Sequence, residues 1–404
     1  MNISNLIGGG YRRRLMMAVG KKALYPDPWV DDGYIWAYYN VTDTSAATPL
    51  FYSSYTNLSA FGANFVVDGV ETPAALSYQF ATTGEHLVKM QSADGTIKES
   101  CFRDVDALKR LYLPDTITSL GNYSISYNSE LTHLWLSEEL TSIGFAALRS
   151  NTVLEVINLY LPKLAYLGYS SNNCQTFAYS YMPRGVVNFP SLHSMPRQAV
   201  FQGTSIKEVR SLGSTTELYR SNGGGDFQDC KSLKKVVLPE TLETIGGFSF
   251  SGCSSLSEIN LPKTITSIGR DAFRGTLITN VIDLPNLTGG LNGSFHSSHI
   301  TEIKDLGSVT SLLGTSGAGG FRNCTHLTKA VIPATMTNMT NGFNGCSSLE
   351  EITIYATTPP TYSGTLTGCS NLAHIYVPAE SVETYKTASG WSSFANIIDA
   401  IPTT

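Results

Sequence analysis

The chain has 404 residues, of which 42% are apolar and only 15% are charged, and its net charge is -5. These proportions allow an apolar core, and an acidic chain without a basic stripe argues against nucleic acid as a partner. No run approaches the roughly 18 consecutive apolar residues that a membrane span requires, so the sequence predicts no transmembrane helix.

Residues 1–25 are predicted to form an N-terminal arm. The triplet Gly8-Gly9-Gly10 gives the backbone conformational freedom, and the basic, methionine-rich segment after it has no clear period. The arm is either a disordered tail or a docking peptide that becomes ordered on a partner. It lacks the pattern of a secretory signal, since the apolar stretch at 15–19 is shorter than the roughly 7–15 residues of such a signal.

Residues 26–97 are predicted to form a small β-sandwich-like domain. The aromatic run Tyr34–Tyr39 has a strong strand propensity. Asp68-Gly69 separates two short apolar runs and has the pattern of a hairpin turn. Further turn patterns at Thr83–Glu85 and Asp94-Gly95 divide the rest into short strands, which is typical of a sandwich.

Residues 98–378 carry a recurring phrase, Leu-x-x-Ile/Leu/Val-x-Leu/Ile/Val, with most successive copies 22 or 23 residues apart. A period of this length indicates a solenoid, in which each repeat stacks on its neighbours. Together with a degenerate copy around Val187–Pro190 there are about twelve repeats, and the predicted fold class is a mainly β solenoid. The clear and looser copies start at Leu108, Leu131, Leu154, Ile206, Leu233, Leu256, Ile278, Ile300, Leu327, Leu349 and Leu372.

Two further signatures accompany the phrase. A Phe stands six residues before the repeat Leu, as in Phe250 to Leu256, and Thr-Ile/Leu-x-x-Ile-Gly follows the phrase, as at 264–269. The last two apolar residues of the phrase are two apart, so they share one face of a short strand. Each repeat should therefore add one Leu, one Ile and one inward-pointing Phe to continuous ladders, and burial of each side chain contributes about 1.5–3 kcal/mol.

Three segments interrupt the period, at 160–183, 213–226 and 314–320. Insertions in a repeat array form loops on one face, which is often the binding face. The end of the chain differs again, because residues 379–404 contain a stretch with helical spacing followed by Trp391. We expect this segment to be a helical cap that covers the last open face of the core.

These motifs resemble the BspA-like leucine-rich repeats of surface proteins from gut and oral bacteria and of some of their phages. The similarity lies in Phe250–Leu256, in Leu238–Gly246 and in the end from Ile375–Pro378 to Trp391. It implies a leucine-rich-repeat solenoid with strands along one face and a role in adhesion and recognition. The segment 65–90 is similar to modules that precede such repeats in phage tail or fibre proteins.

The sequence offers no catalytic residues, metal ligands or cofactor site. Five cysteines each stand three residues before a repeat Leu, and no Cys-x2–4-Cys pair of the kind that zinc sites use is present. These cysteines are predicted to be small buried core residues. His296 and His299 have no third ligand placed to join them, and no nucleophile elbow, P-loop or dinucleotide fingerprint occurs.

Two sets of residues are candidates for ligand binding. The first is a shelf formed by Tyr112, His133 and Trp135, which should lie on adjacent strands about 4.8 Å apart and face solvent. Exposed aromatic rings can stack on sugars, although the same side chains could instead pack against the N-terminal β domain. The second set lies in the first insertion. These tyrosines either bind a ligand or fold locally against the solenoid edge. The set comprises Tyr160, Tyr166, Tyr169, Tyr179 and Tyr181.

The sequence favours a non-enzymatic binding protein. One hypothesis is a virion-associated tail fibre or receptor-binding protein that docks on other structural proteins through its arm and presents the solenoid to a cell-surface glycan or protein. The alternative is a cell-surface or extracellular BspA-like adhesin. A glycan-degrading enzyme is a third hypothesis, for which no acid/base pair is evident. Many fibres are homo-oligomers, although no heptad run indicates one here.

Overall fold

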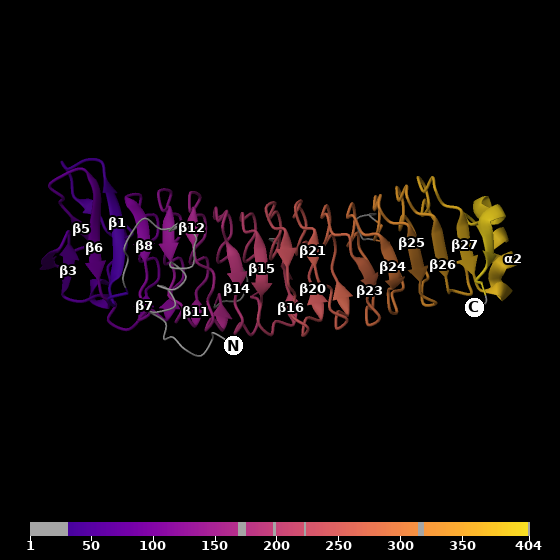
Figure 1. Ribbon diagram of the computed structural model, residues 1–404, viewed down its shortest axis with the longest axis horizontal. Helices are drawn as coiled ribbons and strands as arrows, with labels where there is room; N and C mark the ends of the chain where they lie inside the picture. The colour runs from indigo at the N-terminus through magenta and orange to yellow at the C-terminus, as the bar shows by residue number, and fades with distance from the viewer. Residues whose placement is uncertain (1–30, 169–174, 197–198, 222–223, 314–318, 403–404) are drawn as a thin grey trace, which may run out of the picture.

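The structure is a computed structural model that describes residues 31–168, 175–196, 199–221, 224–313 and 319–402. They form an elongated, mainly β solenoid of about 12 turns, with a β module at one end and helix α2 (Val382–Thr387) at the other (Figure 1). The predicted fold class is confirmed. The predicted arm at 1–25 lies outside the described residues. Within the described part of the chain, no helix is long and apolar enough to cross a membrane.

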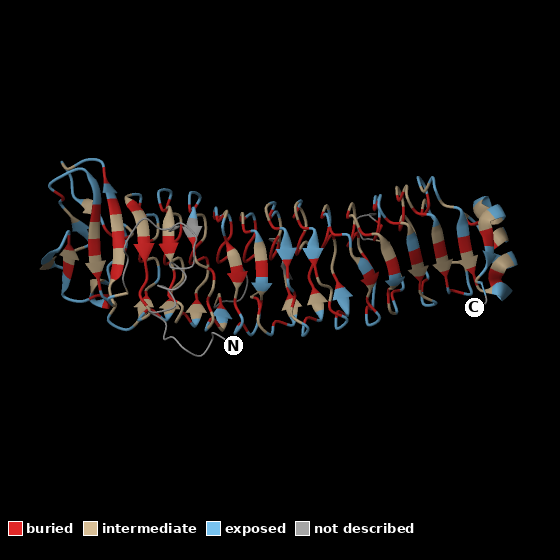
Figure 2. Ribbon diagram, viewed as in Figure 1, coloured by how far each residue is buried: buried red, intermediate tan, exposed pale blue. Residues whose placement is uncertain are grey.

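One parallel strand from each turn builds the main face of the solenoid. Equivalent residues pair in register, as Ile352 of one strand does with Ile375 of the next, and their side chains point into the core. The buried bands in Figure 2 follow this alternation. The strands are β8 (Leu108–Tyr112), β10 (His133–Trp135), β12 (Val156–Ile157), β14 (Val186–Asn188), β15 (Glu208–Ser211), β19 (Lys235–Val236), β21 (Glu258–Ile259), β23 (Val281–Asp283), β24 (Glu302–Asp305), β25 (Lys329–Ile332), β26 (Glu351–Ile354) and β27 (His374–Val377).

The Thr-Ile/Leu-x-x-Ile-Gly segments form a second face of two-residue strands, as the spacing predicts. Ile245 and Ile268 pair in register there and are buried. A small antiparallel hairpin of β17 (Arg220–Ser221) and β18 (Gly224–Gly225) lies within the second predicted insertion. The strands of this face are β7 (Thr96–Ile97), β9 (Ser119–Leu120), β11 (Ser142–Ile143), β13 (Tyr166–Leu167), β16 (Glu217–Leu218), β20 (Thr244–Ile245) and β22 (Ser267–Ile268).

The N-terminal β module continues the solenoid sheet. Its strand β1 pairs antiparallel with β8, so that the sheet order is β12-β10-β8-β1-β6-β3-β4. The core is continuous as well, because the ring of Phe51 stacks on Phe102 of the first turn with centroids 5.5 Å apart. The module therefore covers the first turn. Its elements are β1 (Ile35–Val41), β2 (Thr48–Pro49), η2 (Leu58–Ala60), β3 (Asn64–Val67), β4 (Val70–Pro73), β5 (Ser77–Tyr78) and β6 (Gly84–Met90).

The C-terminal segment closes the other end of the solenoid. Strand β28 (Ile398–Ala400) pairs parallel with β27, after η3 (Ala379–Ser381), α2 and η4 (Ser392–Ile397). Trp391 is fully buried, and its indole Nε1 donates a hydrogen bond of 2.8 Å to the carbonyl of Pro360. This segment thus covers the apolar face that the last repeat leaves open.

Stacked phenylalanine rings fill the corner between the two faces. The phenylalanine ladder runs from Phe177 to Phe343, with neighbouring ring centroids 4.9–5.6 Å apart and ring planes within 10° of parallel. The residue two positions after each Phe has a left-handed backbone, as at Gly252 (φ 74°) and Gly345 (φ 79°). Glycine adopts this conformation without steric cost, which explains the Phe-x-Gly phrase. The rings point inward, as the sequence predicts, from turns rather than from a helix.

The aligned cysteines are core residues that also link neighbouring turns. The thiol of Cys253 donates to the carbonyl oxygen of Phe227 in the preceding turn, 3.0 Å away, and Cys346 donates to Phe321 in the same way. In earlier turns the amide of Asn128 has this role toward Phe102. Several turns thus hold a hydrogen-bond donor at this position, and four of the five aligned cysteines are buried.

We expect the buried thiols to resist alkylation in the folded protein. Burial raises the pKa of Cys324 to about 12 and that of Cys369 to about 11, so little thiolate is present at pH 8. Peptide mapping after iodoacetamide treatment at pH 8 should find Cys230, Cys253, Cys324 and Cys346 unmodified without denaturant and fully modified in 6 M guanidinium. Rapid modification of these four thiols in the folded state would contradict the core assignment.

Candidate functional site

The predicted shelf residues are brought together by strands β8 and β10. Trp135 pairs in register with Tyr112, and His133 pairs with Arg110. His133 and Trp135 are both half-buried. Burial, together with the charge of Arg110, lowers the pKa of His133 below its ordinary value, so this imidazole is neutral at pH 7. The expected adjacency of the strands is confirmed.

Tyr112 does not face solvent, and this part of the prediction is wrong. Its side chain is 4% exposed, and its ring meets that of Tyr38 edge-on, with centroids 6.0 Å apart. The cause is strand β1, which occupies the edge of β8. The alternative of packing against the N-terminal module therefore holds for Tyr112, and only His133 and Trp135 keep partly accessible side chains.

The tyrosines of the first predicted insertion do not form one cluster. Tyr160 bridges to Asn188 beside the main face, whereas Tyr166 lies in β13 on the second face. Tyr179 and Tyr181 follow Phe177 at the corner, where they are 44% and 46% exposed. The remaining candidate, Tyr169, lies outside the described residues.

Two of these tyrosines, Tyr166 and Tyr179, contact neighbouring side chains through their rings. Tyr166 is 50% exposed and stacks on His193, with centroids 5.7 Å apart. Tyr179 lies within 5.7 Å of the guanidinium of Arg149. Tyr166 lies on the second face and Tyr179 lies at the corner, so the insertion does not gather these two rings into one cluster.

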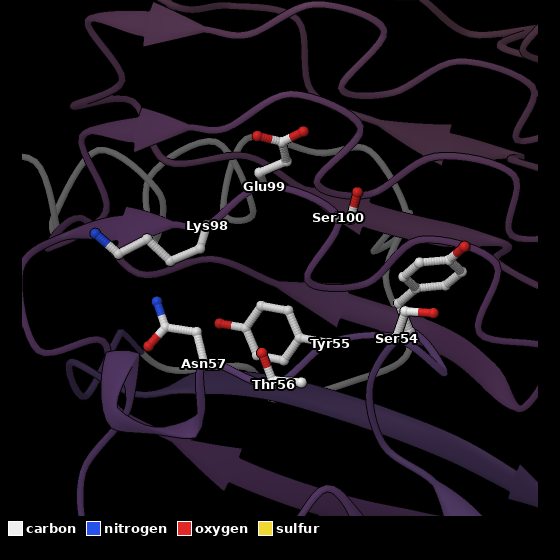
Figure 3. A pocket seen from close by; sticks show the side chains of 8 residues that line it. Ser54, Tyr55, Thr56, Asn57, Lys98, Glu99 and Ser100 are labelled. Atoms are coloured by element: carbon white, nitrogen blue, oxygen red, sulfur yellow. The ribbon is translucent and has the colours of Figure 1, made fainter.

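A small open cleft of about 440 Å³ lies where the N-terminal module meets the first turn. Figure 3 shows Tyr55, Thr56 and Asn57 on one wall and Lys98, Glu99 and Ser100 on the other. The hydroxyl of Tyr55 is buried beside the thiol of Cys101. Tyr52 also lines the cleft. The repeat pattern does not predict this cleft, because its walls come from segments more than 40 residues apart in the sequence.

The stacked strands, the phenylalanine ladder and the two caps define a leucine-rich-repeat solenoid that presents long polar surfaces. Comparison with known proteins identifies the family. Six copies of the BspA type leucine rich repeat match residues 77–207, 221–341 and 314–397, and the chain belongs to this family. No curated protein matches the chain in sequence.

Several solved structures are similar in fold. A leucine-rich repeat protein from Bacteroides ovatus is 17% identical, with a TM-score of 0.50 over 78% of this chain and 88% of that protein. A leucine rich cell surface protein from Faecalibacterium prausnitzii is also 17% identical, with a TM-score of 0.30 over 90% of this chain and 100% of that one. The pneumococcal vaccine antigen PcpA is 16% identical, with a TM-score of 0.31 over 78% and 86%. At these identities the likeness concerns the fold alone.

Proposed function

We propose that this protein is a non-enzymatic recognition protein of the bacterial cell surface, which binds a glycan or a protein through the side of its solenoid. The observation that carries the proposal is the array of BspA type repeats along most of the chain, since the resemblance implies surface proteins with roles in adhesion. A capped solenoid of about 12 turns also offers one long, preorganised surface.

The preorganisation is visible in the backbone. Neighbouring turns are joined at the corner by hydrogen bonds such as that from the Tyr127 amide to the Arg149 carbonyl, 2.8 Å. At the main face, most strands are hydrogen-bonded to the strand of the next turn, as β25 is to β26 and β26 is to β27. The backbone loses little conformational freedom when a ligand binds, because it is already ordered. This favours recognition of an extended ligand through many weak contacts.

A virion fibre or receptor-binding protein is the second candidate. It is favoured by the order of the modules, because a β module precedes and covers the first turn, and because segment 65–90 is similar to modules of phage fibre proteins. On this hypothesis the arm docks on other virion proteins and the solenoid faces the host cell.

Locating the protein separates the two candidates. We expect quantitative mass spectrometry of the producing culture to find this chain in washed envelopes, and we expect external protease to remove it from intact cells. Density-banded particles from the same culture are the comparison sample. Stoichiometric recovery in particles would favour the virion fibre over the cell-surface protein. Recovery only in the cytosol would contradict both functions.

A further inference from the structure

One side of the first solenoid turns carries a tyrosine–arginine ladder that continues from the cleft. It consists of Tyr52, Arg103, Tyr123, Tyr127, Arg149 and Tyr179. The guanidinium of Arg103 lies 5.2 Å from the ring centroid of Tyr52, 4.9 Å from that of Tyr123 and 5.5 Å from that of Tyr127. The guanidinium of Arg149 then lies 5.9 Å from Tyr127 and 5.7 Å from Tyr179. The two arginines thus share the Tyr127 ring.

Three rings of this ladder occupy backbone positions that disfavour them. Tyr123, Tyr127 and Tyr179 have φ values of 53°, 63° and 60°. Bulky side chains rarely adopt this left-handed region. Other turns place glycine at the position of Tyr127 and Tyr179, as at Gly203, Gly252, Gly275 and Gly345. Strained residues of this kind concentrate at functional sites, and here they hold aromatic rings beside the arginines.

The next turn makes room for the last ring. Gly203 stands at the position equivalent to Tyr179, and a Cβ atom there would lie 2.9 Å from the Tyr179 ring. The ring therefore lies over a residue without a side chain, and it is 44% exposed. Part of the Tyr179 side chain therefore remains accessible at the end of the ladder.

The arginines retain unused hydrogen-bonding capacity. In the described part of the chain, Arg103 and Arg149 form no ion pair, and Nε of Arg149 is buried without a partner. Stacking on rings orders a guanidinium while its N–H edge stays available for bidentate binding of a carboxylate. Asp104 follows Arg103 and adds negative charge at that end, so we expect an anionic group to bind at Arg149.

We propose that the tyrosine–arginine ladder is a binding site for a carboxylated saccharide, such as a chain containing uronic or sialic acid. This inference rests on the proposed recognition function and names the ligand class of that surface. Tyrosine rings present flat, amphipathic faces against which sugar rings pack, and ordered guanidinium groups two turns apart fit acidic groups along an extended chain.

A bound acidic peptide fits the surface less well. Peptides are commonly recognised by pairing with a free strand edge or by insertion of side chains into a groove. Here the amides of Tyr123 and Tyr127 already donate to the carbonyls of Phe145 and Arg149, both at 2.8 Å. The ladder therefore offers side chains but no free backbone edge.

Titration calorimetry with the full chain tests the proposal. The probes are oligogalacturonate with its methyl-esterified form, 3′-sialyllactose with lactose, and an oligoglutamate peptide. We expect one carboxylated sugar to bind about tenfold or more tighter than its neutral counterpart, and more weakly at high salt. Arg149→Gln should weaken this binding roughly 10–100-fold, and Arg103→Gln should weaken it less. Absence of discrimination in both sugar pairs, or tighter binding of the peptide, would overturn the proposal.

Two further variants distinguish a loss of binding from a loss of folding. Arg274→Gln changes an exposed arginine at the equivalent position of a later turn, where no tyrosine stacks on it, and should bind as the wild type does. Tyr179→Gly removes a ring but relieves the left-handed backbone, so binding should fall while Tm stays the same or rises. Equal losses in Arg149→Gln and Arg274→Gln would contradict a ladder-specific site.

Binding to intact bacteria separates this inference from the function on which it rests. Labelled wild-type protein should bind cells of the producing species or of species that share its habitat, and Arg149→Gln should bind them less. Equal binding of both proteins would overturn the ladder site and leave the recognition function in place. If the wild type bound the carboxylated sugar but no cells, the ladder site would stand and the proposed surface recognition would fall.

Discussion

Replacing Phe250 by alanine is expected to lower the free energy of unfolding by about 3–5 kcal/mol. Its ring is fully buried and stacks on Phe227 and Phe273, with centroids 5.3 and 5.4 Å away. The substitution removes the ring and leaves a cavity that the neighbouring turns cannot fill, because each turn is hydrogen-bonded to the next. Urea unfolding followed by circular dichroism measures the loss.

A conservative variant shows whether the ladder needs a ring or only an apolar side chain. The equivalent positions of other turns hold Leu148 and Leu366, both buried. Phe250→Leu should therefore cost clearly less than Phe250→Ala. A loss below about 1 kcal/mol for Phe250→Ala would mean that this ring adds little to the stacking of the turns, contrary to its burial.

The second large effect is expected from Asp226, a fully buried carboxyl group. Its Oδ2 accepts a hydrogen bond of 3.0 Å from the amide of Tyr219, and its Oδ1 has no partner. Burial raises the pKa of Asp226 to about 7; hydrogen bonds from the backbone of Tyr219 and Val200 oppose this shift, and the charge of Glu217 adds to it. The ordinary value for this side chain is 3.8. The folded protein therefore holds a proton that the unfolded chain loses near pH 4.

The sign of the pH dependence follows from that difference. Between about pH 4 and pH 7 the folded state binds more protons at Asp226 than the unfolded state, so stability falls as pH rises and then levels off. A pKa difference of about three units corresponds to about 4 kcal/mol. Asp226→Asn should remove this contribution, so that its stability relative to the wild type increases from pH 4 to pH 8.

Urea unfolding of both proteins at pH 4.5, 6 and 8 measures this change. Asp229→Asn is the matched control, because it makes the same substitution at an exposed carboxyl group of the same turn. A constant difference between the wild type and Asp226→Asn at the three pH values would show that Asp226 does not take up a proton on folding.

Much of the candidate site depended on contacts that no repeat predicts. Tyr112 has the same place in its phrase as Trp135, yet only Tyr112 is buried, because Trp36 of β1 pairs opposite it from 76 residues away. Tyr160, Tyr166 and Tyr179 are close in sequence, but the chain turns between them and places them on different sides. Arg103 and Arg149 occupy equivalent positions of their repeats, which the sequence shows. Their shared contact with the Tyr127 ring depends on how the turns stack.

The sequence by itself determined the solenoid, its two strand faces and the inward phenylalanines. It could do so because every turn carries the same short-range pattern and contacts mainly the turns next to it in the chain. Only the tertiary structure decided which outward side chains remain accessible, where the cleft opens and how arginines and tyrosines interleave. These features depend on the antiparallel strand β1 and on the exact turn that each side chain meets, and neither is encoded in the period of the repeat.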